Sequence, residues 1–180
     1  MLCAVTTSYL EMHTPTDLRP STAQDPRFRV EQATEPCPEL NRFFYTAVGG
    51  GWYWTQRLSW TYKQWEDYVR RPELETWIGY YAGTPAGYFE LEQQAEQSIE
   101  LAYFGLLPQF VGRGIGGALL TAAIQRAWQL EPKRVWVHTC TLDGPHALRN
   151  YQARGFQLYH QETEDVELPD VTPGPWPGHS

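Results

Sequence analysis

The stretch Ser98–Gly117, SIELAYFGLLPQFVGRGIGG, constrains the fold of this chain most, because an apolar segment leads through a proline turn into a cluster of glycines. An Ala- and Leu-rich segment, ALLTAAIQRAW, follows directly. This order is typical of a strand that passes through a tight loop into a helix. Glycines at such a junction let the backbone approach a ligand and leave the N–H groups of the first helical turn free to donate. Because the N-terminal end of a helix also carries partial positive charge, the sequence predicts a site for a phosphate or pyrophosphate group.

The length and the charge of the chain exclude several classes of protein. With 180 residues, of which 42% are hydrophobic, the chain can bury one substantial core. We therefore expect a single domain over residues 1–171 and a Pro- and Gly-rich tail over residues 172–180. The net charge of −7 argues against sequence-independent binding to nucleic acid, which needs a basic surface. The same charge is compatible with a cationic partner such as an amine, or it serves solubility alone.

The sequence shows no signal of export, of a membrane span or of a metal centre. No apolar run approaches the ~20 residues that a membrane-spanning helix needs, and the N-terminus lacks the pattern of a signal peptide. The cysteines, Cys3, Cys37 and Cys140, are odd in number and lack the spacing of a zinc site. We therefore expect a cytoplasmic protein without a metal ion, a membrane partner or a nucleic-acid partner.

Periodicity and turn residues predict a mixture of helices and strands. In chain order, the expected elements are strands near 4–12 and 28–33, helices over 38–48 and 60–71, three meandering strands over 75–82, 86–93 and 98–107, a helix over 113–129, a strand over 134–141, a helix over 145–154 and a strand over 155–162. Because one helix lies between two strands near the middle of this order, the pattern indicates an α+β fold with a parallel crossover around residues 113–129.

The glycines of the loop also satisfy a second pattern. Gly112, Gly114 and Gly117 match G-x-G-x-x-G, the fingerprint of dinucleotide-binding folds. Such folds place an acidic residue at the end of the next strand, about 20 residues further on. Here that strand ends in VHTCT, and the first acidic residue after it is Asp143. A dinucleotide enzyme therefore stays only as a rival hypothesis, and the lack of G-K-[ST] argues against a P-loop.

Two motifs follow one another in the second half of the chain. The first is the strand end Phe104–Pro108, FGLLP, followed by Val111–Gly116, VGRGIG, at the start of a helix. The second is the pattern A-x-x-x-Y-x-x-x-G-F, which Ala147–Phe156 satisfies about 30 residues later. In this order the motifs resemble the acetyl-CoA signatures of the GNAT superfamily of N-acetyltransferases, over roughly residues 75–162. The resemblance implies an α+β fold in which helices flank a twisted, mostly antiparallel sheet with splayed central strands.

The resemblance also implies where the cofactor acetyl-CoA would bind. In the family the glycine loop holds the pyrophosphate, and the matching residues here are Val111, Gly112, Arg113, Gly114, Ile115 and Gly116. The backbone N–H of Leu106, with Leu107 beside it, would meet the thioester carbonyl where the strands splay. Two residues depart from the family pattern: Val111 replaces a Gln or Arg, and Gly144 replaces an Asn. We therefore expect backbone N–H groups and Arg113 to hold the pyrophosphate, and one contact with pantetheine either to be missing or to come from Asn150.

Acetyl transfer to an amine needs a base, and it needs a proton for the leaving thiolate. Tyr151 matches the tyrosine that acts as general acid in the family; the alternatives are a hydrogen bond to the sulfur alone, or packing. Glu100 matches a glutamate that some members use as general base, and strand alternation would place it on one face with Ala102 and Phe104. With an ordinary pKa near ~4.3, it would act through water or with a pKa raised by burial. The alternatives are His138 as the base, or a solvated Glu100 and a structural His138.

Aromatic residues crowd into residues 52–77. They are Trp52, Tyr53, Trp54, Trp60, Tyr62, Trp65, Tyr68 and Trp77. In the family this part of the chain walls the acceptor side, where rings would suit an apolar or cationic acceptor. The alternative is that most of them pack between the second helix and the sheet. We expect Arg57 or Arg42 to pair with a carboxylate of the substrate, and Glu90 and Glu92 to lie on a solvated strand face.

The resemblance implies an enzyme that transfers an acetyl group from acetyl-CoA directly to a primary amine of a small molecule or of a protein N-terminus. The alternative is a non-catalytic module on the same fold that binds or senses an acyl-CoA. The sequence leaves the identity of the acceptor open, and an exposed sheet edge would allow a homodimer.

Overall fold

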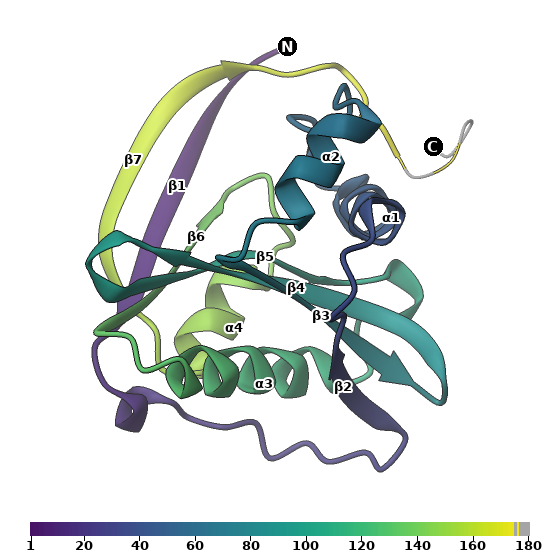
Figure 1. The fold of residues 1–180 in the computed structure, drawn as a ribbon. Helices are drawn as coiled ribbons and strands as arrows, with labels where there is room; N and C mark the ends of the chain where they lie inside the picture. Colours follow the sequence, from purple (N-terminus) through teal and green to yellow (C-terminus); the bar gives the residue numbers. More distant parts are fainter. Residues whose placement is uncertain (175, 177–180) are drawn as a thin grey trace.

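One sheet organises the computed structural model, which describes residues 1–174 and 176. Its strands lie in the order β2-β3-β4-β5-β6-β1-β7 (Figure 1). Their bounds are β1 (Leu2–Met12), β2 (Phe28–Gln32), β3 (Leu74–Tyr81), β4 (Thr84–Gln94), β5 (Ser98–Leu106), β6 (Arg134–Cys140) and β7 (Gln157–Glu167). Strands β5 and β6 are parallel, and the other neighbouring pairs are antiparallel. The expected α+β class and the mostly antiparallel sheet are confirmed. Residues 175 and 177–180 of the expected tail lie outside the described residues.

The helices lie where the sequence predicts them, and local signals decide their ends. They are α1 (Pro38–Gly49), α2 (Tyr62–Val69), α3 (Ile115–Gln129) and α4 (Ala147–Ala153). Helix α2 begins after Thr61, whose hydroxyl accepts a hydrogen bond from the backbone N–H of Gln64. Helix α3 begins after Gly114, whose φ of 79° is left-handed. The first helical residue is therefore Ile115, two positions later than expected.

The two faces of the sheet are covered by different helices. Helices α3 and α4 cover one face, and α1 and α2 cover the other (Figure 1). The larger apolar cluster joins the sheet to α3, and it includes Leu10, Phe89, Leu91, Leu119, Ile124, Val135 and Val137. A smaller cluster of Phe44, Val48, Ile78 and Tyr88 joins the sheet to α1. We refer below to the α3/α4 face and the α1/α2 face.

The first strand lies far from the strand that follows it in sequence. Strand β1 lies between β6 and β7, antiparallel to both, whereas β2 forms the opposite edge of the sheet. Figure 1 shows β1 and β7 as two long curved strands side by side that rise beyond the rest of the sheet. Strand β7 forms the second edge of the sheet, and it carries Glu162, Glu164, Asp165 and Glu167. Direct pairing of two such edges would bring acidic side chains together, which disfavours a homodimer formed in that way.

The two central strands separate soon after they meet. Strands β5 and β6 pair only from Ser98 with Arg134 to Glu100 with Trp136. Beyond that point β5 runs on to Leu106 and β6 to Cys140 without pairing with each other. This divergence confirms the expected splay, and Glu100 lies at its vertex.

A β-bulge changes which side chains of β5 share a face. Leu101 pairs with Leu91 but Tyr103 pairs with Glu90, so Ala102 is an extra residue in β5. Phe104 packs on the α3/α4 face, whereas Glu100 faces His138 on the α1/α2 face. The prediction that Glu100, Ala102 and Phe104 share one face was therefore wrong, because simple alternation ignores the extra residue.

Candidate functional site

The glycine loop holds its shape through left-handed backbone. After a turn at Pro108–Phe110, Gly112 and Gly114 have φ angles of 82° and 79°, a region that residues with a side chain rarely adopt. A Cβ atom on either glycine would meet nothing within 4 Å, so solvent or a ligand can reach the backbone here. The Val111 side chain is 59% exposed and has no role in the core. The loop therefore presents the N–H groups of the first turn of α3 at an open surface.

A hollow of about 520 Å³ lies beside this loop. Its lining comes from residues 23–26 of the β1–β2 connection, from Phe28, and from Arg113–Ile115 with Ala118. The guanidinium of Arg113 lies 5.1 Å from the centre of the Phe110 ring, at the edge of this hollow. Arg113 is thus placed where it could contact an anionic ligand of the loop.

The backbone of β5 distinguishes Leu106 from Leu107. The N–H of Leu107 donates to the carbonyl of Ala86 at 2.8 Å, so it is already bonded to β4. Because successive N–H groups of a strand point to opposite sides, the N–H of Leu106 points toward the side where β6 has diverged. Of the two expected backbone donors, only Leu106 is free to meet a ligand between the strands.

Tyr151 lies in the core of the α3/α4 face, on helix α4. Its side chain is 6% exposed and packs edge-on against Phe104 and Phe156, with ring centres 6.1 and 6.0 Å away. Burial raises the pKa of its hydroxyl well above the ordinary value, and the negative charge of Asp143 adds to this. The phenol is therefore protonated at neutral pH. Asn150 precedes it on α4 and is half-buried.

Glu100 and His138 form a pair on the α1/α2 face at the vertex of the splay. The Glu100 carboxylate lies 3.2 Å from Nδ1 of His138 and accepts a hydrogen bond from Gln94 Nε2 at 2.7 Å. Glu100 is 9% exposed, whereas the His138 side chain is 47% exposed. The hydrogen bond to Glu100 raises the pKa of His138 above its usual value. The alternatives of a solvated Glu100 and of a structural His138 in the core are therefore both wrong: Glu100 is buried, and His138 is half-exposed.

Arg154 is a residue that the sequence analysis missed. A Cβ atom placed on Gly117 would lie 2.8 Å from Nη1 of Arg154, so the guanidinium lies against the first turn of α3. Among the described residues, its buried Nε has no hydrogen-bond partner. Its position inside the second motif, directly before Gly155, was the available signal.

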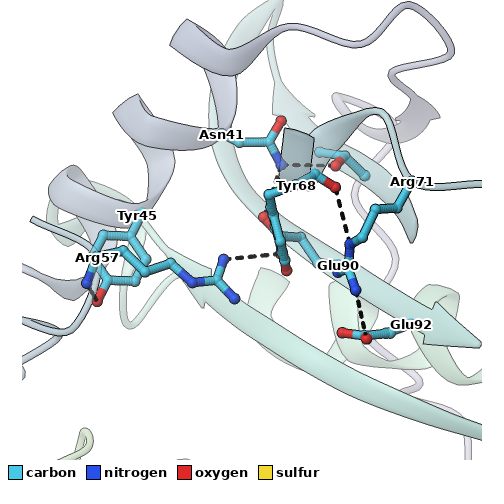
Figure 2. Close-up of polar contacts among 8 residues, drawn as sticks. Asn41, Tyr45, Arg57, Tyr68, Arg71, Glu90 and Glu92 are labelled. Atoms are coloured by element: carbon cyan, nitrogen blue, oxygen red, sulfur yellow. Dashed lines mark hydrogen bonds and ion pairs between the residues drawn. The ribbon is translucent and has the colours of Figure 1, made fainter. Parts of the chain in front are cut away.

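Glu90 is buried, contrary to the expectation of a solvated strand face. It is 1% exposed and accepts a hydrogen bond from Asn41 Nδ2 at 2.8 Å and another from the Tyr68 hydroxyl (Figure 2). Glu92, two residues on, pairs with Arg71 at 2.9 Å. Sequence alternation suggested exposure because it does not show that α1 and α2 cover this part of β4.

Arg57 points into the protein and not toward an open acceptor side. Its guanidinium lies 3.9 Å from the Glu90 carboxylate, and its side chain is 13% exposed. The expectation that Arg57 pairs with a substrate carboxylate was therefore wrong for the arrangement seen here. Arg42 lies exposed on α1. The aromatic segment divides, because Trp65 on α2 is buried whereas Trp52 and Tyr62 are exposed.

Two kinds of feature are missing from the described part of the chain. No three His, Cys, Asp or Glu side chains come together there in a group that could hold a metal ion. No described helix is long and apolar enough to cross a membrane.

Comparison with known proteins identifies the family of this chain. A model of the Acetyltransferase (GNAT) family matches residues 33–156. A GCN5-related N-acetyltransferase from Kribbella flavida is similar with a TM-score of 0.62 and 18% identity, over 87% of this chain and 56% of that one. An enzyme of the same description from Sphaerobacter thermophilus has a TM-score of 0.65 and 14% identity, over 95% of this chain and 54% of that one. The chain thus spans little more than half the length of these two structures.

A third solved structure is closer in length. It is a GNAT family acetyltransferase from Elizabethkingia anophelis with acetyl-CoA bound, similar with a TM-score of 0.54 and 19% identity, over 76% of this chain and 80% of that one. None of the curated proteins compared matches the chain. Because the family model covers more than half of the chain, and the sheet with its splayed strands is the fold of these structures, the chain belongs to the GNAT acetyltransferase family.

Proposed function

We propose that this protein transfers an acetyl group from acetyl-CoA directly to a primary amine. One observation carries the proposal: the gap between β5 and β6 has Tyr151 on the α3/α4 face and the Glu100–His138 pair on the α1/α2 face. A thioester that enters from one face can thus meet an amine that enters from the other.

The glycine loop and its neighbours fit the phosphates of the cofactor. The open N–H groups of residues 112–116 would hold the pyrophosphate, with Arg113 beside them. Arg154 carries a positive charge and has no acidic partner among the described residues. It could therefore take the role of the Gln or Arg that the family has at the position of Val111. Asn150 remains the candidate contact of pantetheine. When bound, acetyl-CoA supplies an activated acetyl group.

The protein's own groups would then polarise the acetyl carbonyl and move the protons. Because the N–H of Leu107 is bonded to Ala86 of β4, the N–H of Leu106 faces away from β4 and would donate to the carbonyl oxygen. The Glu100–His138 pair would take the proton of the amine, directly or through water. Tyr151 is protonated and would donate a hydrogen bond to the thiolate that leaves. Because its raised pKa makes Tyr151 a weak acid, we assign it the role of stabilising the thiolate through this hydrogen bond and not that of transferring its proton completely.

The test is acetyl transfer by the whole chain with a panel of small amines, a protein N-terminus and the variant Tyr151→Phe. We expect turnover with at least one amine, and a fall in turnover in the variant that exceeds its change in acetyl-CoA affinity. Binding of acetyl-CoA without turnover of any amine would favour the non-catalytic acyl-CoA-binding module instead. Binding of NADH in place of acetyl-CoA would favour a dinucleotide enzyme.

The surroundings of the enzyme are part of the proposal. The cysteines Cys3, Cys37 and Cys140 are free, which suits a reducing cytoplasm. A homodimer stays possible through surfaces other than the acidic β7 edge, and sedimentation of the purified chain tests it.

A further inference from the structure

The guanidinium of Arg57 fills an aromatic cage on the α1/α2 face. Its central carbon lies 3.9 to 5.9 Å from the ring centres of five side chains, which are Tyr45, Trp60, Trp65, Tyr68 and Tyr103. We call these five rings the Arg57 cage. Rings arranged around a cation in this way attract it through their negative faces, and the attraction grows as water is excluded.

A buried carboxylate makes a positive charge in the cage necessary. Glu90 is 1% exposed, lies against the cage, and is held by Asn41 and Tyr68 (Figure 2). Burial raises its pKa, whereas the nearby charge of Arg57 acts in the opposite direction. An unpaired buried charge is strongly destabilising, so the ionised form of Glu90 requires a cation beside it.

Arg57 satisfies this requirement loosely. Its closest nitrogen, Nη1, lies 3.9 Å from the Glu90 carboxylate, which is longer than a hydrogen bond. The same nitrogen is buried and lacks a hydrogen-bond partner among the described residues. The guanidinium therefore supplies charge to the cage without the close pairing that would make it irreplaceable.

The segment that carries Arg57 is built as an irregular connection between α1 and α2. It starts at the run Gly49–Gly51, contains Tyr53 with a left-handed φ of 59°, and ends at Thr61. Trp54 ties it to the β6–α4 connection through a hydrogen bond of 3.3 Å from Nε1 to Asp143. Trp54 also packs on Tyr103, so this segment reaches from the cage to the loop that follows β6.

We propose that the Arg57 cage is a cation-binding site for the acceptor, and that Arg57 occupies it in the absence of substrate. The proposal rests on the proposed acetyl transfer and names the class of acceptor: an amine that carries a second positive group. An alkylammonium or guanidinium group that replaced Arg57 would keep the charge around Glu90 balanced, so the exchange would leave no buried charge unpaired.

The position of the cage explains why the caged group is not the one acetylated. The reacting amine must lose its proton, whereas the cage favours a charged group. Tyr103 of the cage lies on the same face of β5 as Glu100, and because of the bulge at Ala102 the two pair with Glu90 and Glu92, only two residues apart on β4, which corresponds to roughly 7 Å along the strand. A flexible molecule with two cationic ends spans that distance, with one end in the cage and the other at Glu100.

The experiment measures cation binding without acetyl-CoA, so it is independent of catalysis. Trp60 and Trp65 line the cage, and their fluorescence reports its occupancy. The probes are methylguanidinium and butylammonium, with urea and butanol as neutral controls, titrated at pH 8 into wild type, Arg57→Ala and the double variant Arg57→Ala/Glu90→Gln. We expect saturable binding of both cations to Arg57→Ala, about tenfold tighter than to wild type. The neutral probes and the double variant should show no such preference.

The other outcomes overturn the proposal. If folded Arg57→Ala binds cations no better than wild type, or binds urea equally well, the cage is not a cation site. If Arg57→Ala does not fold, added methylguanidinium must restore the wild-type circular dichroism spectrum; failure to do so would make Arg57 part of the core. If the cations bind as expected but no amine is acetylated, the proposed function fails while the cation site stands.

A kinetic comparison then connects the cage to the acceptor. With a linear diamine, Arg57→Ala should lower KM because the competing side chain is gone, whereas KM for a monoamine of equal length should stay unchanged. Equal changes for the two amines would show that the cage does not bind the acceptor.

Discussion

The two faces of the splay are built in different ways. On the α3/α4 face, the backbone of a short continuous loop creates the candidate cofactor site, and Gly112 and Gly114 supply its left-handed turns. On the α1/α2 face, side chains from α1, α2, β4 and the α1–α2 connection meet around Glu90 and Arg57 (Figure 2). A site made by local backbone leaves a motif in the sequence, whereas a site made by distant side chains does not. This difference makes separate effects expected: changes on one face should alter cofactor affinity, and changes on the other should alter the use of the acceptor.

The largest effect is expected on the α1/α2 face from Glu100→Gln. Loss of the base should lower turnover about 100-fold or more, because a positioned general base contributes that much. Acetyl-CoA affinity should stay within about twofold, since this change lies on the opposite face from Tyr151. Steady-state kinetics and calorimetry measure the two quantities. Glu92→Gln is the matched control, because Glu92 pairs with Glu100 across the strands but is bound to Arg71. Equal losses in the two variants would contradict the assignment of Glu100.

The next effect is expected on the α3/α4 face from Gly114→Val. A β-branched residue at a φ of 79° strains the start of α3 and disturbs the N–H groups there, so acetyl-CoA affinity should fall about 10- to 100-fold. Gly83→Val is the control, because Gly83 has a φ of 83°, meets open space, and lies in the β3–β4 turn. Calorimetric titration should find weak binding only for Gly114→Val, although both variants lose stability. Comparable affinities would remove the loop from the cofactor site.

A smaller effect is expected from Arg154→Met. The variant keeps the length of the side chain but removes its charge, so acetyl-CoA should bind about tenfold more weakly. S-acetylpantetheine lacks the phosphates of the cofactor and should be used equally well by variant and wild type. Arg149→Met, at an exposed site on the same helix, serves as control. If the loss extended to S-acetylpantetheine, Arg154 would have a structural role only.

The smallest effect concerns His138 and pH. Because its pKa is raised in the folded protein, its pairing with Glu100 contributes stability below the unfolded pKa of about 6.5, and that contribution is lost as pH rises through the raised value. The side chain is 47% exposed, so the contribution should stay below about 1 kcal/mol. Urea unfolding of wild type and His138→Gln at pH 5.5 and 8.5 measures it. The two proteins should differ more at pH 5.5; a larger difference at pH 8.5 would contradict the pair.

The features that the sequence predicted depend on neighbours along the chain. Turn residues and periodicity located the helices, the glycine loop and the parallel crossover. These signals are local: Thr61 and Gly114, for example, fix the starts of α2 and α3 through contacts or backbone angles within one helical turn. The resemblance supplied the splay, which the short pairing of β5 with β6 confirms.

The features that the sequence did not predict depend on distant contacts. Strand β1 pairs with β6 and β7, more than 120 residues away in sequence, and its local pattern does not predict which strands it pairs with. The extra residue Ala102 places Glu100 and Phe104 on opposite faces of β5. A single bulge leaves no periodic pattern in the sequence from which it could be predicted. The sequence suggested a solvated Glu90 and an Arg57 that contacts the substrate, and only the arrangement of α1 and α2 over β4 shows that Glu90 is buried and that Arg57 lies against it.

The most direct test of the account is to incubate the whole chain with acetyl-CoA and a linear diamine, and to follow the products by mass spectrometry. The account predicts that acetylated diamine and free CoA appear in equal amounts, and that Glu100→Gln forms both far more slowly. Acetyl-CoA that binds the glycine loop but is never consumed, with this or any other amine, would contradict the claim that the two faces of the splay form one active site.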